Sequence, residues 1–371
     1  EILMIKIKKN CQLDAKGAFL ANYNFSDLIF FDIESTGFSI EYSNVYLIGA
    51  VYYQKNQWVL EQFFAENLSE EKKIIEEFFT LASAYNYIIH FNGDTFDIPY
   101  LEKKASLHHL EAPFKKITSI DILKLIRPYQ KILGLENCKL KTIEHFLDIN
   151  RKDIYSGKEL IELYQQFCKK HDPKVKENIL LHNEEDLLYL IPLLKIFDLI
   201  QFIKDLKVNI LDNIQAFDIT VDNDLLFSFA LLKAAPLSLQ LKNENWACSI
   251  TKDSLHLDFK VKLVEDTMYH FFPNYKDYYY LIDEDEAIHK SLGAFLPNDK
   301  RKQAKVSNCY TKRKGLFLQT FQPDIRLPVF KKSYDSKEMY ILLDDNKIDH
   351  QKLNLKDLAL AFIDSQIPRS L

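Results

Sequence analysis

Short apolar runs alternate with helical patterns along the first half of the chain. Residues 28–33 form an apolar run of strand-forming side chains, and residues 45–53 and 57–65 predict two more strands joined by a tight turn. Apolar positions at helical spacing follow over residues 69–85, and residues 87–91 have the composition of a buried strand. Three consecutive strands followed by this alternation predict an α/β domain in which helices flank a mixed sheet.

The remaining patterns divide the chain into four parts. Helical spacing predicts further helices over residues 96–107, 140–147, 158–168, 175–203 and 355–363. Strands are predicted over residues 117–123, 255–263, 278–282, 316–321 and 339–343. The expected parts are an N-terminal arm (1–27), the α/β domain (28–200), a mostly helical bridge (201–246) and a smaller β-rich C-terminal domain (247–371).

The composition is that of a globular protein with unusually few glycines. Hydrophobic residues make up 47% and charged residues 27% of the chain, which excludes wholesale disorder. Only 8 of 371 residues are glycine, which excludes collagen-like repeats and a GxGxxG dinucleotide loop. No uncharged apolar stretch reaches about 18 residues, so no membrane span or membrane partner is expected. Scattered cysteines and the absence of a signal-peptide pattern predict a cytoplasmic protein.

Two carboxylates stand out on the first predicted strand. Asp32 and Glu34 are two residues apart, so both side chains point to one face of the strand. Like charges about 4 Å apart repel by about 4 kcal/mol at an effective dielectric constant near 20, so the pair needs a compensating cation or a solvated strand end. Taken alone, the pair favours a strand that runs out into solvent at the turn formed by residues 35–37.

Further candidate site residues lie in two other places: the loop where a strand meets a helix, and the predicted long helix. Asp97 follows Asn92 in the loop after residues 87–91, where it can reach the sheet edge; the alternative is an Asn-Gly turn before an ordinary helix N-terminus. His182 and Asp186 share one helix face because they are four residues apart; the alternative is a surface histidine on a solvated acidic face.

Together these residues favour metal-dependent chemistry on phosphodiesters. Four acidic groups from a strand, a loop and a helix are hard oxygen ligands that suit Mg²⁺ or Mn²⁺ rather than zinc. Two such cations can clamp the attacking and leaving oxygens of a phosphodiester displacement. A histidine beside them is suited to take a proton from the attacking water near neutral pH.

The motifs, in this order, resemble the DEDD (DnaQ-like) 3′→5′ exonucleases of the ribonuclease H-like superfamily. D-x-E is met by Asp32 and Glu34, and N-x3-[FY]-D by residues 92–97. The third motif combines the spacing of Y-x3-D with the histidine of H-x4-D, and this hybrid, His182 with Asp186, resembles the YprB-type branch. The resemblance covers roughly residues 28–200 and implies a ribonuclease H-like mixed sheet flanked by helices.

The resemblance also implies a role for each matched residue. Asp32, Glu34 and Asp186 would hold one metal ion, with Asp32 bridging to a second ion that Asp97 positions. His182 would activate the nucleophilic water. The implied substrate-binding residues are Thr36, Gly37, Phe38, Asn92 and Phe96.

The charge distribution bears on the partner. A net charge of -5 disfavours nucleic acid, but residues 287–333 carry a local charge of +9 against -14 for the rest of the chain. Aromatic residues lie among these cations, as in a groove for a single strand; a solvated basic loop is the alternative. The candidate basic patch comprises Lys300, Arg301, Lys302, Lys305, Lys312, Arg313 and Lys314.

The sequence thus predicts a two-metal 3′→5′ exonuclease that uses Mg²⁺ or Mn²⁺ and releases nucleoside 5′-monophosphates. Nucleic acid is the expected partner, with DNA favoured over RNA as a single strand or 3′ overhang, in a repair role where a helicase is a candidate second partner. An RNA-directed exonuclease and a non-catalytic nucleic-acid-binding adaptor with the same fold stay open as alternatives.

Overall fold

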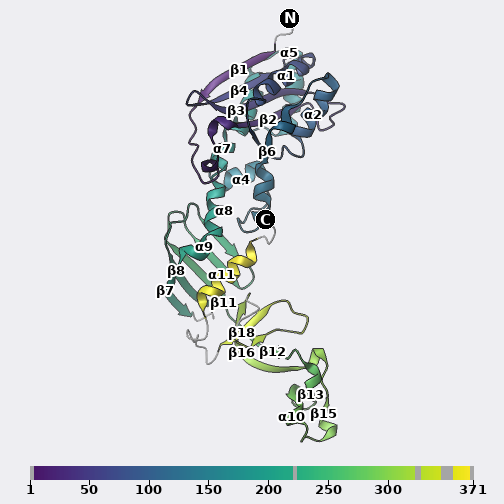
Figure 1. Ribbon diagram of the computed structural model, residues 1–371, viewed down its shortest axis with the longest axis vertical. Coiled ribbons are helices and arrows are strands. Elements are labelled where there is room, and N and C mark those ends of the chain that lie inside the picture. Colours follow the sequence, from purple (N-terminus) through teal and green to yellow (C-terminus); the bar gives the residue numbers. More distant parts are fainter. Residues whose placement is uncertain (1–3, 220–223, 322–326, 344–353, 368–371) are drawn as a thin grey trace. The chain divides into compact units, whose positions relative to one another are not determined.

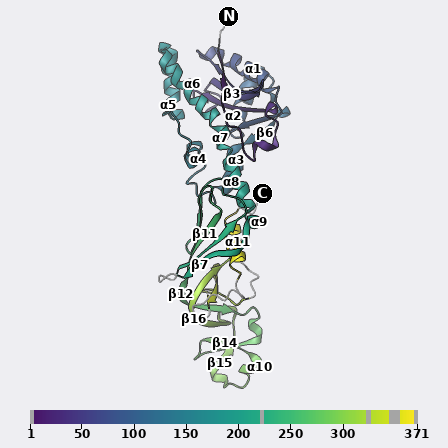
Figure 2. The same cartoon turned by 90° about the vertical axis from the view of Figure 1, so that its left-hand side faces the viewer.

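The computed structural model describes residues 4–219, 224–321, 327–343 and 354–367. The chain divides into two compact units (Figures 1 and 2). The first unit comprises Glu1–Lys131 and Leu135–Ile203, and the second comprises Ile132–Gly134 and Lys204–Leu371. The predicted α/β fold is confirmed, with extra β-rich sheets in the C-terminal region.

A mixed sheet forms the centre of the first unit, with the strand order β1-β4-β3-β2-β5-β6. The ladders from β1 to β2 are antiparallel, whereas β2, β5 and β6 run parallel to one another. The strands are β1 (Ile5–Cys11), β2 (Leu28–Ser35), β3 (Val45–Gln54), β4 (Gln57–Phe64), β5 (Tyr87–His90) and β6 (Thr118–Asp121).

Helices pack on both faces of this sheet, among them α1 (Glu71–Ala82) and α6 (Pro173–Leu188) (Figures 1 and 2). The other helices of this part of the chain are α2 (Asp97–His108), α3 (Ile122–Ile126), α4 (Leu140–Phe146), α5 (Gly157–Lys170), α7 (Leu190–Leu193) and α8 (Ile196–Lys204). Phe31 of β2 stacks on Phe78 of α1 with ring centroids 5.3 Å apart. Its neighbour Asp32 points the other way and accepts a hydrogen bond from Asn183 of α6. The helices α1 and α6 therefore lie on opposite faces, and the carboxylates share the face of α6.

The predicted N-terminal arm is wrong for residues 5–11. These residues form β1, which pairs with β4 along its whole length and makes one edge of the sheet. The strand begins with alternating isoleucine and lysine residues. Lysine side chains on an exposed edge strand hinder its pairing with other chains. Residues 5–11 are therefore part of the domain and not an appendage to it.

The predicted long helix over residues 175–203 is divided into α6, α7 and α8. Pro192 explains the break, because proline lacks an N–H and its ring clashes with the carbonyl four residues earlier. That earlier residue is Leu188, where α6 ends. Asp186 consequently lies in the last turn of α6.

The second unit consists mainly of antiparallel sheets. Their strand orders are β7-β8-β11-β10-β9, β12-β16-β18-β17 and β14-β13-β15. The first two sheets contain β7 (Ile210–Ile219), β8 (Asp224–Leu231), β9 (Leu239–Lys242), β10 (Trp246–Ile250), β11 (His256–Lys262), β12 (Val264–Phe271), β16 (Tyr310–Thr320), β17 (Val329–Phe330) and β18 (Met339–Leu343). The remaining elements are β13 (Tyr278–Leu281), β14 (Glu286–His289), β15 (Arg301–Gln303), α9 (Leu206–Asn209), α10 (Lys290–Gly293) and α11 (Leu355–Gln366).

The predicted helical bridge over residues 201–246 is also wrong. In its described residues, 201–219 and 224–246, the regular structure apart from the end of α8 and the single turn α9 consists of the strands β7, β8 and β9 and the start of β10. In β8 every second residue from Leu225 to Leu231 is buried, which is the period of a strand and not of a helix. The β-rich part thus begins near residue 210 rather than 247. Among the residues that the structure describes, no helix is long and apolar enough to span a membrane.

Candidate metal and nucleic-acid site

All five side chains to which the sequence assigns catalysis line one cavity of the first unit. The cavity has a volume of about 440 Å³, and its lining includes Asp32, Glu34, Asp97, His182 and Asp186. Asn92 and Phe96, two of the predicted substrate-binding residues, line it as well. Residues from β2, the start of α2 and the end of α6 are thus brought together from positions more than 150 residues apart in the sequence.

A glycine allows α6 to approach the sheet at this point. Gly49 of β3 pairs with Asp32 of β2, and a Cβ added at Gly49 would lie 2.1 Å from Asn183 Oδ1 and 2.4 Å from Leu187 Cδ1. Only a residue without a side chain leaves room for the helix at this distance. The side chains of Asn183 and Leu187 on α6 therefore fill the space beside Gly49.

Asn183 is a site residue that the sequence reasoning missed. Its amide is fully buried, donates to Asp32 Oδ2 at 2.9 Å and accepts from Gln62 Nε2 at 3.0 Å. It therefore fixes the orientation of the Asp32 carboxylate. Its position directly after His182, on the helix that carries the third motif, was the signal available in the sequence.

The turn after β5 directs Asp97 into the cavity. Asn92 has a positive φ of 66°, which asparagine tolerates, and its N–H donates to Asp121 Oδ1 at 2.9 Å. A Cβ on Gly93 would lie 2.6 Å from the His90 ring, so glycine is required in this turn. Asp97 then begins α2 with only 6% of its surface exposed. Burial raises the pKa of Asp97 to about 7, although hydrogen bonds from backbone N–H groups act in the opposite direction.

His182 faces the carboxylates with one ring nitrogen and a partner carboxylate with the other. Its Nε2 lies 3.7 Å from Glu34 Oε1 and 3.4 Å from Asp186 Oδ2. Its Nδ1 lies 2.7 Å from Asp153 Oδ2, and both of these residues are buried. Because a buried carboxylate accepts hydrogen bonds, this contact assigns a proton to Nδ1 and directs Nε2 toward the cavity.

The loop that carries Asp153 is anchored to α6. Glu185, which is buried, accepts hydrogen bonds from the backbone N–H groups of Lys152 at 3.0 Å and Asp153 at 2.8 Å. The adjacent Arg151 forms ion pairs with both Asp186 and Glu144. The alternative of a solvated helix face therefore does not hold for Glu185, which is buried, or for Asp186, which has a cationic neighbour.

The electrostatics of the cavity separate the carboxylates into two kinds. Burial, followed by the charge of Asp186, holds the pKa of Asp32 and that of Glu34 well above their usual range. Burial also acts on Asp186, but His182 and Arg151 outweigh it and lower the pKa of Asp186. His182 has a raised pKa, because its bonds to Asp186 and Asp153 outweigh its burial. A cation bound in the cavity would therefore stabilise the ionised forms of Asp32 and Glu34.

The donor set fits a divalent metal ion. One ligand atom each of Glu34, His182 and Asp186 lie within 4.8 Å of one another. Buried carboxylates that repel each other in this way are stabilised by a hard cation such as Mg²⁺ or Mn²⁺. The described residues hold one more such group, His90 with Asp94 and Asp121, whose hydrogen bonds instead support the turn after β5.

The predicted contacts of the terminal nucleotide lie on the loop after β2. Thr36 forms a backbone hydrogen bond and a side-chain hydrogen bond with Asn44, each 2.8 Å long, and the Gly37 carbonyl accepts from Ser43 Oγ at 3.0 Å. Phe38 is 81% exposed, and its ring lies 6.1 Å from that of Phe96, which lines the cavity. An exposed aromatic ring beside a polar cavity is available for stacking on a base.

The candidate basic patch lies on and around β15 and β16 in the second unit. Three of its cations form ion pairs with acidic residues that come just before residues 287–333. Lys300 pairs with Asp283 at 2.6 Å, Lys312 with Asp285 at 3.0 Å and Arg313 with Glu286 at 3.4 Å. When the four acidic residues 283–286 are added to residues 287–333, the net charge of the segment falls from +9 to +5. Residues 322–326 of this segment lie outside the described residues.

The remaining members of the patch differ in their contacts. The Arg301 guanidinium lies over the Tyr279 ring, 4.6 Å from its centroid. Lys302, Lys305 and Lys314 are exposed, and in the part of the chain that the structure describes they form no ion pair. These three lysines are the members of the patch whose charge is still available to a partner.

Comparison with known proteins finds a similarity over the part of the chain that forms the mixed sheet. A family model described as the RNase_H superfamily matches residues 29–197. Over this segment, somewhat less than half of its length, the chain is similar to that superfamily. The matched segment includes the cavity, from Asp32 on β2 to Asp186 on α6.

Several known proteins are similar to this chain over part of its length. The uncharacterized protein YprB of Bacillus subtilis (strain 168) is 28% identical over 184 residues, which is 49% of this chain and 43% of YprB. A family B DNA polymerase from Pyrobaculum calidifontis aligns with a TM-score of 0.37 at 16% identity, covering 48% of this chain and 25% of the polymerase. E. coli exonuclease I in complex with a dT13 oligonucleotide aligns with a TM-score of 0.32 at 13% identity, covering 60% and 54%.

Proposed function

We propose that the ribonuclease H-like domain is a metal-dependent 3′→5′ exonuclease that hydrolyses nucleic acid to nucleoside 5′-monophosphates. The observation that carries the proposal is the convergence of Asp32, Glu34, Asp97, His182 and Asp186 on one cavity. Four carboxylates and one histidine at such a place suit phosphodiester hydrolysis better than a purely structural role, because their mutual repulsion costs stability unless cations bind.

Two Mg²⁺ or Mn²⁺ ions are the proposed cofactors. Asp32, Glu34 and Asp186 would hold one ion, with Asp32 shared by a second ion that Asp97 positions. When bound, such ions supply Lewis-acid stabilisation of the phosphoryl oxygens and lower the pKa of a coordinated water. Asn183 keeps the Asp32 carboxylate in place through its 2.9 Å hydrogen bond.

His182 is the proposed general base. It accepts the proton of the attacking water at Nε2, while Asp153 accepts the hydrogen bond from Nδ1 and stabilises the resulting imidazolium. The electrons of the breaking P–O bond move to the 3′ oxygen of the shortened strand, which leaves as an alcohol after it takes up a proton. The proposed contacts of the released nucleotide are Thr36, Gly37, Phe38, Asn92 and Phe96.

DNA is the proposed substrate, as a single strand or a 3′ overhang, and a repair role follows from that substrate. The exposed lysines of the basic patch would add contacts to the phosphates of a longer strand. An adaptor that binds nucleic acid without cutting it is less favoured, because the five side chains required for hydrolysis are present together in the cavity.

The proposal is tested with 5′-labelled single-stranded DNA and RNA of equal sequence and Mn²⁺ or Mg²⁺. Wild-type protein is expected to give a ladder that shortens from the 3′ end, and EDTA or Asp186→Asn is expected to abolish it. His182→Ala should lower the rate by about 10²–10⁴-fold, the usual contribution of a general base. Glu177→Gln is the matched control, an exposed acid changed to its amide on the same helix.

The outcomes separate the candidate functions. Intact DNA and RNA under all conditions, together with a stable complex in a gel shift, would favour the adaptor. Cleavage of RNA alone would favour the RNA-directed enzyme. Equal activity of wild type and Asp186→Asn would remove the carboxylate cluster from the reaction.

A further inference from the structure

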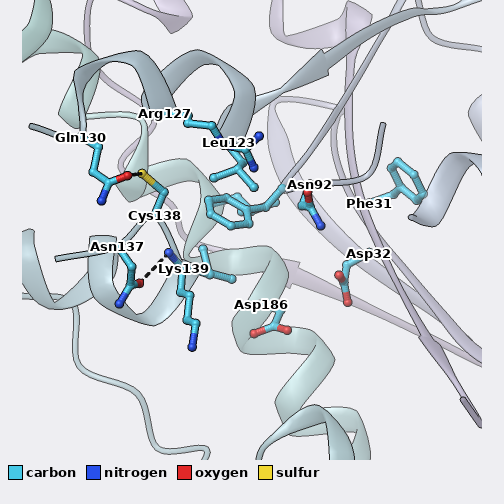
Figure 3. Close-up of a pocket in the computed structure, with 13 residues that line it drawn as sticks. Phe31, Asp32, Asn92, Leu123, Arg127, Gln130, Asn137, Cys138, Lys139 and Asp186 are labelled. Carbon is cyan, nitrogen blue, oxygen red and sulfur yellow. Dashed lines mark hydrogen bonds between the residues drawn. The ribbon is translucent and has the colours of Figure 1, made fainter. Parts of the chain in front are cut away.

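A second pocket of the first unit shares a wall with the carboxylate cavity. Its volume is about 570 Å³, which lies within the range of small-molecule sites. Six residues line both cavities: Asp32, Phe91, Asn92, Lys139, Leu140 and Asp186. Figure 3 shows Asp32 and Asp186 on one side of this pocket and Gln130, Asn137 and Cys138 on the other.

The walls of the second pocket combine apolar surface with positive charge. Phe91, Leu123 and Leu190 contribute apolar surface, and Arg127 and Lys139 contribute the cations. Both cations are exposed, and among the described residues neither has an acidic partner within ion-pair distance. Unpaired cations beside apolar side chains suit a nucleotide, whose phosphate binds the cations while its sugar and base contact the apolar side chains.

We propose that this second pocket binds the nucleotide on the 5′ side of the bond that is cut. The inference rests on the proposed exonuclease function. The terminal nucleotide has its proposed contacts around Phe96, which lines the carboxylate cavity and not the second pocket. A strand whose scissile phosphate lies at Asp32 and Asp186 then has its next nucleotide on the other side of these two residues, where Arg127 and Lys139 are found.

A pair of substrates tests this assignment. The 4-nitrophenyl ester of thymidine 5′-monophosphate has a terminal nucleotide but 4-nitrophenol in place of the strand on the 5′ side. Water attacks the phosphorus and the P–O bond to 4-nitrophenolate breaks, so the reaction itself is the same. Arg127→Ala changes the cation that lines the second pocket and not the carboxylate cavity; it is expected to lower kcat/KM for a single-stranded oligonucleotide by about 10-fold and to leave that of the ester unchanged.

The matched control removes one exposed cation that lines neither cavity. Lys131→Ala causes the same change of net charge in the same region, four residues after Arg127, and should alter the turnover of neither substrate. Equal losses on both substrates in the pocket variant would overturn the assignment, as would equal losses in the pocket and control variants.

A binding measurement keeps the test independent of turnover. In EDTA, fluorescence anisotropy of a labelled single strand should show about 10-fold weaker binding to the pocket variant than to wild type or the control variant. The slope of the logarithm of affinity against that of salt concentration should fall by about 1 for each lost phosphate contact. Unchanged affinity and slope would overturn the pocket assignment even if the wild-type protein hydrolyses nothing, which would separately contradict the proposed function.

Discussion

At the scale of single residues, the charge on Asp97 links stability to pH. Its pKa is raised from 3.8 to about 7, so the folded protein holds this proton more tightly than the unfolded chain. The stability that the protonated group contributes is complete below about pH 4 and is lost as the pH rises through 7. In EDTA, Asp97→Asn should therefore unfold at a higher temperature than wild type at pH 8, and the difference should vanish near pH 4.

The measurement is a series of thermal unfolding curves between pH 4 and pH 8. A gain of 1 kcal/mol corresponds to roughly 2–4 °C for a domain of this size. Glu177→Gln is the control, since this exposed acid lies outside the cavity and should shift the curve at neither pH. A pH-independent difference between Asp97→Asn and wild type would mean that the carboxyl group is not held protonated by the fold.

The residues of the site differ in how far the sequence predicts them. The five side chains of the cavity lie in short motifs with a defined spacing, so they are visible without a structure. Asn183 and Asp153 have no such spacing, because their roles come from tertiary contacts with Asp32 and His182. Contacts of this kind depend on how α6 packs against the sheet and the loop, which local sequence does not encode.

At the scale of elements, the approach of α6 to β3 depends on one glycine. A Cβ at Gly49 would lie far inside contact distance of Asn183 and Leu187, and both side chains are buried. Gly49→Ala should therefore destabilise the protein by about 1–3 kcal/mol, the usual cost of overpacking a core. It should also lower nuclease activity, because Asn183 orients Asp32.

Gly157→Ala is the matched control for this substitution. Gly157 is the first residue of α5, and a Cβ there would have no neighbour within 4 Å. Chemical denaturation should show a lower midpoint for Gly49→Ala and an equal or higher midpoint for Gly157→Ala, since alanine is favoured over glycine in helices. Equal midpoints for all three proteins would contradict the close packing of α6 on β3.

The elements themselves were predictable where periodicity is strong. The strands β2 to β5 follow the apolar runs within one or two residues, and α5 follows its helical spacing. Residues 210–219 and 224–231 were assigned to a helical bridge because short apolar runs satisfy either period when their partners are unknown. Their strand character follows from the pairing of β7 with β8 and of β8 with β11, and from the alternating burial along β8.

At the scale of the whole molecule, two compact units imply that stability is not a single quantity. The first unit has an apolar core around the mixed sheet, and in the second unit Met268, Phe317, Phe330 and Tyr340 form a separate core cluster. All carboxylates of the proposed metal site belong to the first unit. A ligand that binds one folded unit stabilises that unit by mass action.

Differential scanning calorimetry should therefore resolve two unfolding transitions, of which Mn²⁺ raises one. An ion concentration of 100 times the dissociation constant contributes about 2.7 kcal/mol, or roughly 5–11 °C for a unit of this size. Asp186→Asn should abolish the shift and leave the other transition in place, whereas Glu177→Gln should keep it. A single transition that moves as a whole with Mn²⁺ would mean that the two units unfold together, and no shift at all would contradict metal binding to the folded protein.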